Sequence, residues 1–244
     1  METLDSQDPL AIAVTEAIRT GDLPVLQRLL AENPGLATAH ITGDCGKEAR
    51  SLLHIATDWP GHFPNGPQVV TTLVAAGADP NARFSGPHTE TPLHWAASSN
   101  DIPVLDALIA AGADIEAPGA VIGGGTPLAD ARVFGQWRAA RRLIEHGAHV
   151  TFQDAATLGL LDHVETYVAS TGPLTPDEIT RAFWGACHGG RFATAQYLHQ
   201  HGADINWIGY DDKTPLDIAQ AEDAAEVVQW LLAQGAKTRA QLLA

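Results

Sequence analysis

Hydrophobic positions in this chain fall into short segments that recur at nearly constant spacing. An apolar stretch followed by Gly-Ala occurs five times, as LVAAGAD from Leu73, LIAAGAD from Leu108, LIEHGAH from Leu143, LHQHGAD from Leu198 and LLAQGAK from Leu231. The glycines Gly77, Gly112 and Gly147 are each 35 residues apart. Glycine is favoured where a helix ends in a left-handed residue, so the pattern predicts a helix that ends at each of these positions.

A second pattern precedes each of these segments and predicts the start of another helix. It reads SLLHIA from Ser51, TPLHWA from Thr91, TPLADA from Thr126 and TPLDIA from Thr214. Serine and threonine cap helix N-termini, and proline is favoured in the first turn. The chain is therefore predicted to be all-α, with one domain over residues 1–244 and seven helix pairs at about 10–36, 51–80, 91–116, 126–150, 153–171, 178–205 and 214–244.

These segments resemble the ankyrin-repeat family, of the type found in bacteria, whose signature is Thr-Pro-Leu-His-x-Ala. The resemblance covers about residues 10 to 237. It implies a solenoid of stacked helix-turn-helix units, in which inner helices and hairpin tips form a concave face that usually meets the ligand. It also implies that His54 and His94, the signature histidines, brace neighbouring hairpins.

The amino-acid composition narrows the range of possible partners and sites. The 244 residues include 29 acidic and 14 basic side chains, a formal charge of −15, which disfavours nucleic acid and anionic membranes as partners. No basic and apolar leader and no run of 18 apolar residues is present, so we expect a cytoplasmic protein. Cys45 and Cys187 are expected to be free thiols, and the spacing of Cys and His residues predicts neither a metal site nor a cofactor.

Departures from the plain repeat are concentrated in the first five units. The turns at Gly21 and Asn65 are 44 residues apart, which leaves room for inserts at 39–51 and at 58–64. The second insert carries Trp59, His62 and Phe63, which either pack on the protein or contact a ligand. We expect this loop to fold over the concave groove near Trp95.

A column of inner-helix positions aligns Asp130 and Asp154 with residues that are apolar in most other repeats. A buried carboxylate needs a partner, which a nearby arginine or a bound ligand would supply. The two aspartates are expected to lie in one groove, where at least one pKa rises. The glycine-rich tip 119–126 would line the same groove but does not match a nucleotide-binding motif. The candidate ligand-binding residues are Trp59, His62, Phe63, His88, Glu90, Trp95, Asp130, Phe134, Asp154, Trp184 and His188.

Two functions follow from these observations. The first is a binding module that holds a protein or peptide, favourably a basic one, on an acidic concave face. The second is a small-molecule site or an acid/base enzyme around Trp95, in which Asp130 or Asp154 acts as the catalytic group. The sequence leaves open whether any reaction is catalysed, because function depends on the site and not on the scaffold.

Overall fold

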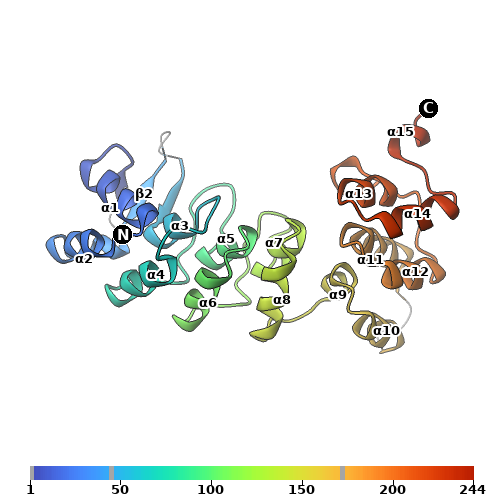
Figure 1. Cartoon of the computed structure of the whole chain (residues 1–244), viewed down its shortest axis with the longest axis horizontal. Helices are drawn as coiled ribbons and strands as arrows, with labels where there is room; N and C mark the ends of the chain where they lie inside the picture. The colour runs from blue at the N-terminus through green and yellow to red at the C-terminus, as the bar shows by residue number, and fades with distance from the viewer. Residues whose placement is uncertain (1–2, 44–46, 171–173) are drawn as a thin grey trace. The chain divides into compact units, whose positions relative to one another are not determined.

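The computed structural model describes residues 3–43, 47–170 and 174–244. Its contacts divide the chain into two compact units, Met1–His149 (unit 1) and Val150–Ala244 (unit 2). Figure 1 shows that each unit consists of helix pairs placed one after another along the chain. The predicted all-α repeat architecture is confirmed, whereas one domain over residues 1–244 stays a prediction.

Unit 1 contains four helix pairs within its described residues. In each pair, the first helix is called the inner helix and the second the outer helix. The pairs are α1 (Pro9–Thr20) with α2 (Leu23–Glu32), α3 (Leu52–Thr57) with α4 (Gly66–Ala75), α5 (Pro92–Ser98) with α6 (Ile102–Ala110), and α7 (Pro127–Val133) with α8 (Trp137–Glu145). The inner helices α3, α5 and α7 pack against one another in sequence order, as do the outer helices α4, α6 and α8.

Unit 2 contains three further pairs and a short final helix. The pairs are α9 (Phe152–Leu158) with α10 (Leu161–Ser170), α11 (Pro176–His188) with α12 (Phe192–Gln200), and α13 (Pro215–Ala221) with α14 (Ala225–Ala233), followed by α15 (Arg239–Leu242). A 3-10 turn, η2 (Tyr210–Asp212), precedes α13. The inner helix α11 packs against both α9 and α13, so these three pairs stack in chain order.

The insert at 39–51 forms structure that the helical pattern did not predict. After the 3-10 turn η1 (Leu36–Thr38), strands β2 (His40–Thr42) and β3 (Ala49–Ser51) pair antiparallel, and β1 (Thr3–Asp5) pairs parallel with β2. The sheet order is β1-β2-β3. Ala49 and Ser85 also exchange backbone hydrogen bonds of 2.8 and 2.9 Å, which connect this sheet to the hairpin ahead of α5.

The apolar signature positions form the core of each unit. Leu93 and Leu128 in unit 1 and Leu216 in unit 2 follow the proline of their helices and are buried. Cys187 is also buried, and burial raises the pKa of its thiol, as expected of a core cysteine; Cys45 lies outside the described residues. None of the helices in the described part of the chain combines the length and apolar character that a membrane span needs.

Candidate functional site

The inner helices begin with a shared hydrogen-bond pattern that fixes the hairpin tips. His54 Nδ1 accepts from the Ser51 N–H at 3.3 Å, and its Nε2 donates to the Glu90 carbonyl at 3.1 Å. His94 Nδ1 likewise accepts from the Thr91 N–H at 3.1 Å, and its Nε2 donates to the Gly125 carbonyl at 3.2 Å. Burial lowers the pKa of His54 to about 3 and that of His94 to about 4, so both rings are neutral. Each histidine braces the residue before the next helix cap, as the resemblance implied.

Trp184 performs this bracing in unit 2. Its indole Nε1–H donates to the Lys213 carbonyl at 3.0 Å, and Lys213 immediately precedes the helix cap Thr214. The side chain is buried and packs against His188 and Tyr210, with ring centroids 5.6 and 5.1 Å away. Trp184 thus has the bracing role in unit 2 that His54 and His94 have in unit 1.

Asp154 is a helix-capping residue, and its predicted alignment with Trp95 and Asp130 is wrong by one position. It is the third residue after the cap Thr151, where His54 and His94 stand in their own helices. Its Oδ2 accepts from the Thr151 N–H at 3.0 Å and from the Thr151 hydroxyl at 2.5 Å. The fourth position of α9 belongs to Ala155, whose N–H donates to the Thr151 carbonyl. A threonine cap with an acidic third residue forms a capping box, which explains why an aspartate occurs here.

Asp130 does occupy the fourth position, and its side chain is fully buried. Its N–H donates to the carbonyl of the cap Thr126, as the N–H of Trp95 donates to that of Thr91. The Asp130 carboxyl has a relative exposure of 0%. Its Oδ1 accepts a 3.3 Å hydrogen bond from the Val121 N–H of the glycine-rich tip, while no donor reaches its Oδ2 among the described residues. A buried carboxylate oxygen without a donor is costly unless a proton is present.

The second carboxyl of the site belongs to Glu90, the last residue of the hairpin ahead of α5. It is 6% exposed, and its carboxyl and that of Asp130 act on each other. Burial raises the pKa of Glu90, and Trp95 and His88 oppose part of that rise. Two buried carboxyl groups that interact in this way favour protonation of at least one of them.

Desolvation and mutual repulsion set the titration of this carboxyl pair. Burial, followed by the charge of Glu90, raises the pKa of Asp130 to about 7, and burial raises the pKa of Glu90. The folded chain therefore keeps a proton that the unfolded chain releases near the ordinary aspartate pKa of 3.8. The stabilisation from this proton is complete below pH 3.8 and is lost as the pH rises through about 7.

An aromatic cluster lies beside the carboxyl pair. The Trp95 ring packs edge-on against His54 with centroids 4.9 Å apart, and its centroid is 5.4 Å from that of Phe84. Trp95 and Phe84 are each half-buried, so part of each ring faces solvent. Arg83 donates to the backbone carbonyls of Thr89 and Pro118 and thereby joins two successive hairpin tips. His88, Glu90, Trp95 and Asp130 thus all belong to unit 1, whereas Asp154, which was expected to lie in the same groove as Asp130, belongs to unit 2.

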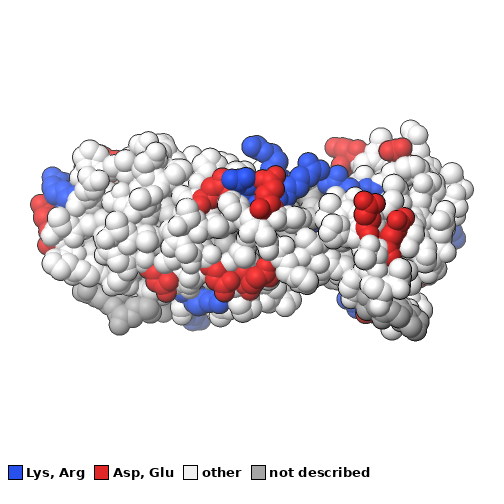
Figure 2. Space-filling view, turned by 90° about the horizontal axis from the view of Figure 1, so that it is seen from below, with Lys and Arg blue, Asp and Glu red and all other residues white. Residues whose placement is uncertain are grey.

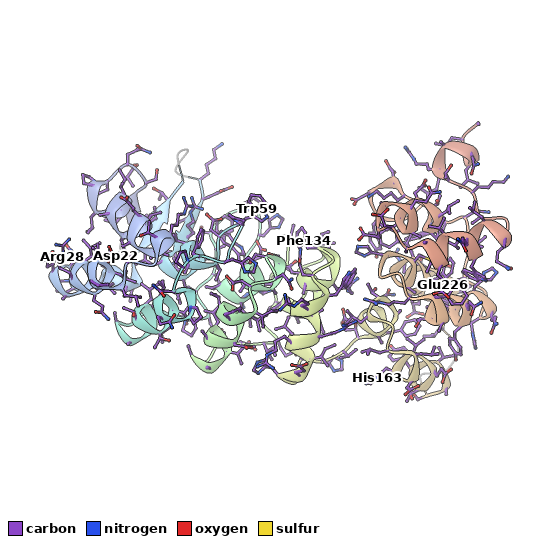
Figure 3. All side chains as sticks on the ribbon, in the orientation of Figure 1. Asp22, Arg28, Trp59, Phe134, His163 and Glu226 are labelled. Atoms are coloured by element: carbon purple, nitrogen blue, oxygen red, sulfur yellow. The ribbon has the colours of Figure 1, made fainter. Side chains whose placement is uncertain are left out.

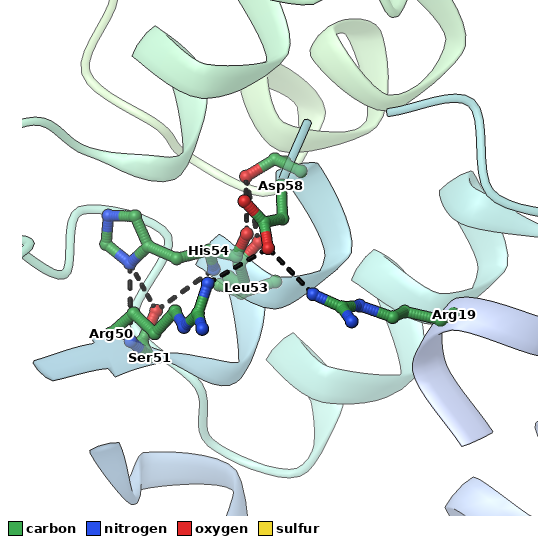
Figure 4. A network of polar contacts seen from close by, with 7 residues as sticks. Arg19, Arg50, Ser51, Leu53, His54 and Asp58 are labelled. Carbon is green, nitrogen blue, oxygen red and sulfur yellow. Dashed lines mark hydrogen bonds and ion pairs between the residues drawn. The ribbon is translucent and has the colours of Figure 1, made fainter. Parts of the chain in front are cut away.

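The insert 58–64 is fixed at both ends. Asp58 Oδ2 accepts from Arg19 at 2.8 Å and from Arg50 at 2.9 Å, as Figure 4 shows. At the other end, the His62 N–H donates to Asp101 Oδ2 at 2.6 Å, and His62 Nε2 donates to the Ser99 carbonyl at 3.0 Å. Asp101 is itself the buried cap of α6. These contacts tie the loop to the turn between α5 and α6.

Trp59 in this loop is 82% exposed. A ring with that exposure does not cover Trp95, so the expectation that the loop folds over the groove near Trp95 is wrong for Trp59. The physical reason is that the loop is fixed by polar anchors, His62 on the α5–α6 turn and Asp58 on two arginines, and not by its largest apolar side chain. Phe63 is half-buried, and His62 is exposed.

Phe134 lies at a position equivalent to the start of this loop. It is the C-cap residue of α7 and is 46% exposed, whereas Trp59 directly follows Asp58, the C-cap residue of α3. Because α3, α5 and α7 are stacked equivalents, their C-terminal ends lie along one edge of unit 1, here called the inner-helix edge. Figure 3 shows Trp59 and Phe134 along this edge.

The candidate residues of unit 2 have contacts of their own. His188 Nε2 lies 3.8 Å from Glu222 Oε1, and its ring packs on Trp184. The guanidinium of Arg181 lies over the Trp207 ring at 5.7 Å, and its Nη1 donates to the Tyr210 hydroxyl at 3.4 Å. This second aromatic cluster is held together by its own cation–π and edge-on contacts.

Three cavities lie away from the carboxyl pair, with volumes of about 390, 390 and 530 Å³. Glu90, Trp95 and Asp130 line none of the three. Among the described residues, no group of three or more His, Cys, Asp or Glu side chains is arranged to hold a metal ion. One of the two cavities of about 390 Å³ is lined by Ser6, Ile12, Thr15, Glu16, Arg19, Thr20, Ile41, Arg50 and Ile55.

Comparison with known proteins gives consistent matches to one family. Residues 53–154 match a model of ankyrin repeats (3 copies), and residues 184–232 match a model of ankyrin repeats (many copies), together more than half of the chain. An ankyrin repeat and KH domain-containing protein of Caenorhabditis briggsae is 28% identical over 70% of this chain. Protein fem-1 homolog A-A of Mus musculus is 34% identical over 47% of this chain.

The chain spans only a small part of these relatives. The matched region makes up 7% of the length of the nematode protein and 18% of the length of the mouse protein. The similarity therefore concerns the repeats alone. The bacterial type of repeat stays a prediction.

Proposed function

The chain belongs to the ankyrin-repeat family, and we propose that unit 1 binds a segment of a partner protein across its inner helices, with Trp59 and Phe134 as anchors. Ankyrin repeats generally bind protein partners, which supports a protein-interaction module. The repeats place equivalent helix ends at regular intervals, so successive side chains along the inner-helix edge can contact successive parts of one extended or helical segment.

The observation that carries this proposal is the exposed ring of Trp59 on an anchored loop. A tryptophan that is 82% exposed leaves a large apolar surface in water. Asp58 and His62 fix the backbone on either side, so binding would cost little loop entropy. Tryptophan is also enriched among the residues that dominate binding energy in protein interfaces.

Charge supports a basic partner. The formal charge of −15 would steer a positively charged protein toward this chain and would slow the approach of an acidic one. The negative charge is not uniform, since Figure 2 shows Lys and Arg side chains gathered among Asp and Glu along one edge of the face in view. We propose that the residues along the inner-helix edge of unit 1 determine which partner binds. A cytoplasmic location stays a prediction.

A displayed library of random peptides tests this proposal, because selection on the wild-type chain does not require that the partner be identified. The selected peptides are expected to lose at least about tenfold in affinity on Trp59→Ala, the loss of a typical hot spot. Phe134→Ala should weaken the same peptides to a smaller degree. Leu232→Ala is the matched control, because Leu232 is a 53% exposed residue of an outer helix. Peptides that bind Trp59→Ala and wild type equally would refute the proposal.

The second predicted function, an acid/base or small-molecule site, keeps only part of its basis. Asp154 caps a helix in unit 2, which leaves Asp130 with Glu90 as the candidate group. A carboxyl with a pKa of about 7 can exchange a proton near neutral pH. Its complete burial argues against direct contact with a reacting small molecule.

A further inference from the structure

One cavity of unit 1 combines two arginines with an apolar wall. Its volume is about 390 Å³, and α1, the strands β2 and β3, and α3 all contribute to its lining. Ile12, Ile41 and Ile55 supply apolar side chains, while Arg19 and Arg50 are the two cationic residues of the lining. Apolar walls with a few polar groups are typical of a site for a small ligand.

The helix α1 contributes one of its faces to this cavity. Val14 and Ile18 are buried in the core, whereas the lining residues are spaced so that they share another side of the helix. Ile12 on that side is 49% exposed, so an apolar side chain there is in contact with solvent. The lining residues of α1 are Ile12, Thr15, Glu16, Arg19 and Thr20.

The two guanidinium groups meet at one carboxylate oxygen. Arg19 Nη2 donates to Asp58 Oδ2 at 2.8 Å, and Arg50 Nη1 donates to the same atom at 2.9 Å (Figure 4). A guanidinium carries several N–H donors, and neither side chain makes a second hydrogen bond within the described part of the chain. The side chains of Arg19 and Arg50 are 45% and 34% exposed, so a ligand in the cavity can reach their remaining N–H groups.

The charges around this cavity favour an anion with a single negative charge. Arg19 and Arg50 carry two positive charges against the one negative charge of Asp58. Glu16 also lines the cavity, but it is exposed, so water weakens its repulsion of an anion. A phosphate group carries more negative charge than a carboxylate, and Asp58 and Glu16 would repel it more strongly.

We propose that this cavity binds a small amphipathic carboxylate. The carboxylate accepts hydrogen bonds from the remaining N–H groups of Arg19 and Arg50, and the apolar body of the ligand packs on the three isoleucines. A free organic acid and the C-terminal residue of a peptide both offer this chemistry. The site needs no contact with Trp59 or Phe134, so the inference goes beyond the proposed function.

Small probes test the cavity directly. Hexanoate, its neutral analogue hexanamide, acetate and inorganic phosphate would be titrated into the wild-type chain at pH 7. The methyl NMR signals of Ile12 and Ile41, assigned with Ile12→Val and Ile41→Val, would report binding. Hexanoate is expected to bind at least about tenfold more tightly than hexanamide, because only hexanoate makes charge-assisted hydrogen bonds to the arginines. Acetate should bind more weakly than hexanoate, because it lacks the apolar body.

N-acetyl-leucine distinguishes the two sources of the carboxylate. It has the terminal carboxylate and the amide group of a C-terminal residue, and hexanoate has only the former. Tighter binding of N-acetyl-leucine assigns the cavity to a peptide C-terminus, and tighter binding of hexanoate assigns it to a free organic acid. N-acetyl-leucine amide has no carboxylate and should bind no better than hexanamide.

Variants separate ligand binding from a purely structural ion pair. Arg19→Gln and Arg50→Gln each remove one cation and should weaken hexanoate binding by about tenfold. Glu16→Gln and Asp58→Asn each remove a competing negative charge and should strengthen it, whereas a purely structural ion pair predicts no gain. Arg28→Gln is the matched control, because Arg28 is an exposed arginine of the outer helix α2 that does not line the cavity.

The outcome is decisive even if one variant does not fold. Glu16 is exposed, so Glu16→Gln should keep the fold where Asp58→Asn does not. Equal binding of hexanoate and hexanamide to the wild-type chain, or no shift with either, would overturn the proposal. Phosphate that binds more tightly than hexanoate would also overturn it, because the ligand class would then be wrong. Trp59→Ala leaves the cavity lining intact, so hexanoate binding to this variant tests the cavity separately from the anchor.

Discussion

Asp130 in unit 1 and Asp154 in unit 2 stand near the start of equivalent inner helices, one position apart in the repeat. Asp154, third after its cap, accepts hydrogen bonds from the Thr151 backbone and hydroxyl. Asp130, fourth after its cap, turns into the protein, where it accepts from the Val121 N–H and where burial and the charge of Glu90 raise its pKa. The same residue type is a helix cap in one unit and half of a carboxyl pair in the other.

This difference follows from helix geometry. Consecutive helical residues point about 100° apart, so the third residue reaches back to its cap whereas the fourth faces the neighbouring repeat. Asp217 in α13 and Glu178 in α11 follow the first pattern, each with its own threonine cap, and those hydrogen bonds lower the pKa of both carboxyls. Asp130 instead has its pKa raised to about 7. An acidic residue in these helices is therefore informative only after its position from the cap is known.

The largest expected effect tests whether the two units respond alike to loss of the same core residue. Leu93 in α5 and Leu216 in α13 are the signature leucines of their repeats, and both are buried. Leu93→Ala and Leu216→Ala should each lower the free energy of unfolding by about 2–5 kcal/mol, because each leaves a cavity. Chemical denaturation followed by hydrogen exchange would show which unit loses protection. Uniform loss across both units for either variant would mean that the chain unfolds as one cooperative body.

A smaller effect is expected from the capping aspartate of unit 2. Asp154→Ala leaves the Thr151 N–H and hydroxyl without their acceptor, at a cost of about 1–3 kcal/mol in the free energy of unfolding. Thermal melting at pH 7 measures this loss. Asp130→Ala is the comparison, since it removes an unbalanced charge together with packing. Greater damage from Asp130→Ala than from Asp154→Ala at pH 8 would contradict the roles assigned to the two residues.

Most of the fold could be predicted from the sequence, because the cap, proline and glycine signals recur in phase. In the described part of the chain, the helix pairs begin close to the predicted starts, whereas most outer helices end several residues before the predicted ends. The sheet was missed, since β1 pairs with a segment 37 residues away in register, Thr3 with His40, and no local pattern encodes that contact.

The candidate site was predicted only in part. Asp130 and Asp154 were expected to lie in one groove with the other candidate residues, whereas the carboxyl that acts on Asp130 is that of Glu90. Glu90 lies directly before the cap Thr91, a position that a sequence pattern assigns to a solvent-exposed tip, whereas in the structure it is buried. The prediction for the loop with Trp59 was wrong because two polar anchors outweighed the tendency of the ring to pack.

The central claim is that burial and the neighbouring charge of Glu90 keep a proton on Asp130, and carbon-13 NMR of the side-chain carboxyls between pH 3 and 9 tests it most directly. Asp130→Asn and Glu90→Gln assign the two signals. The claim predicts that the Asp130 signal keeps the chemical shift of a protonated acid at pH 5 and titrates near pH 7, and that the pKa of Glu90 lies above its ordinary value. The capping residue Asp217 should have a pKa below its ordinary value in the same spectra. Titration of Asp130 and Glu90 independently near pH 4 would contradict the claim.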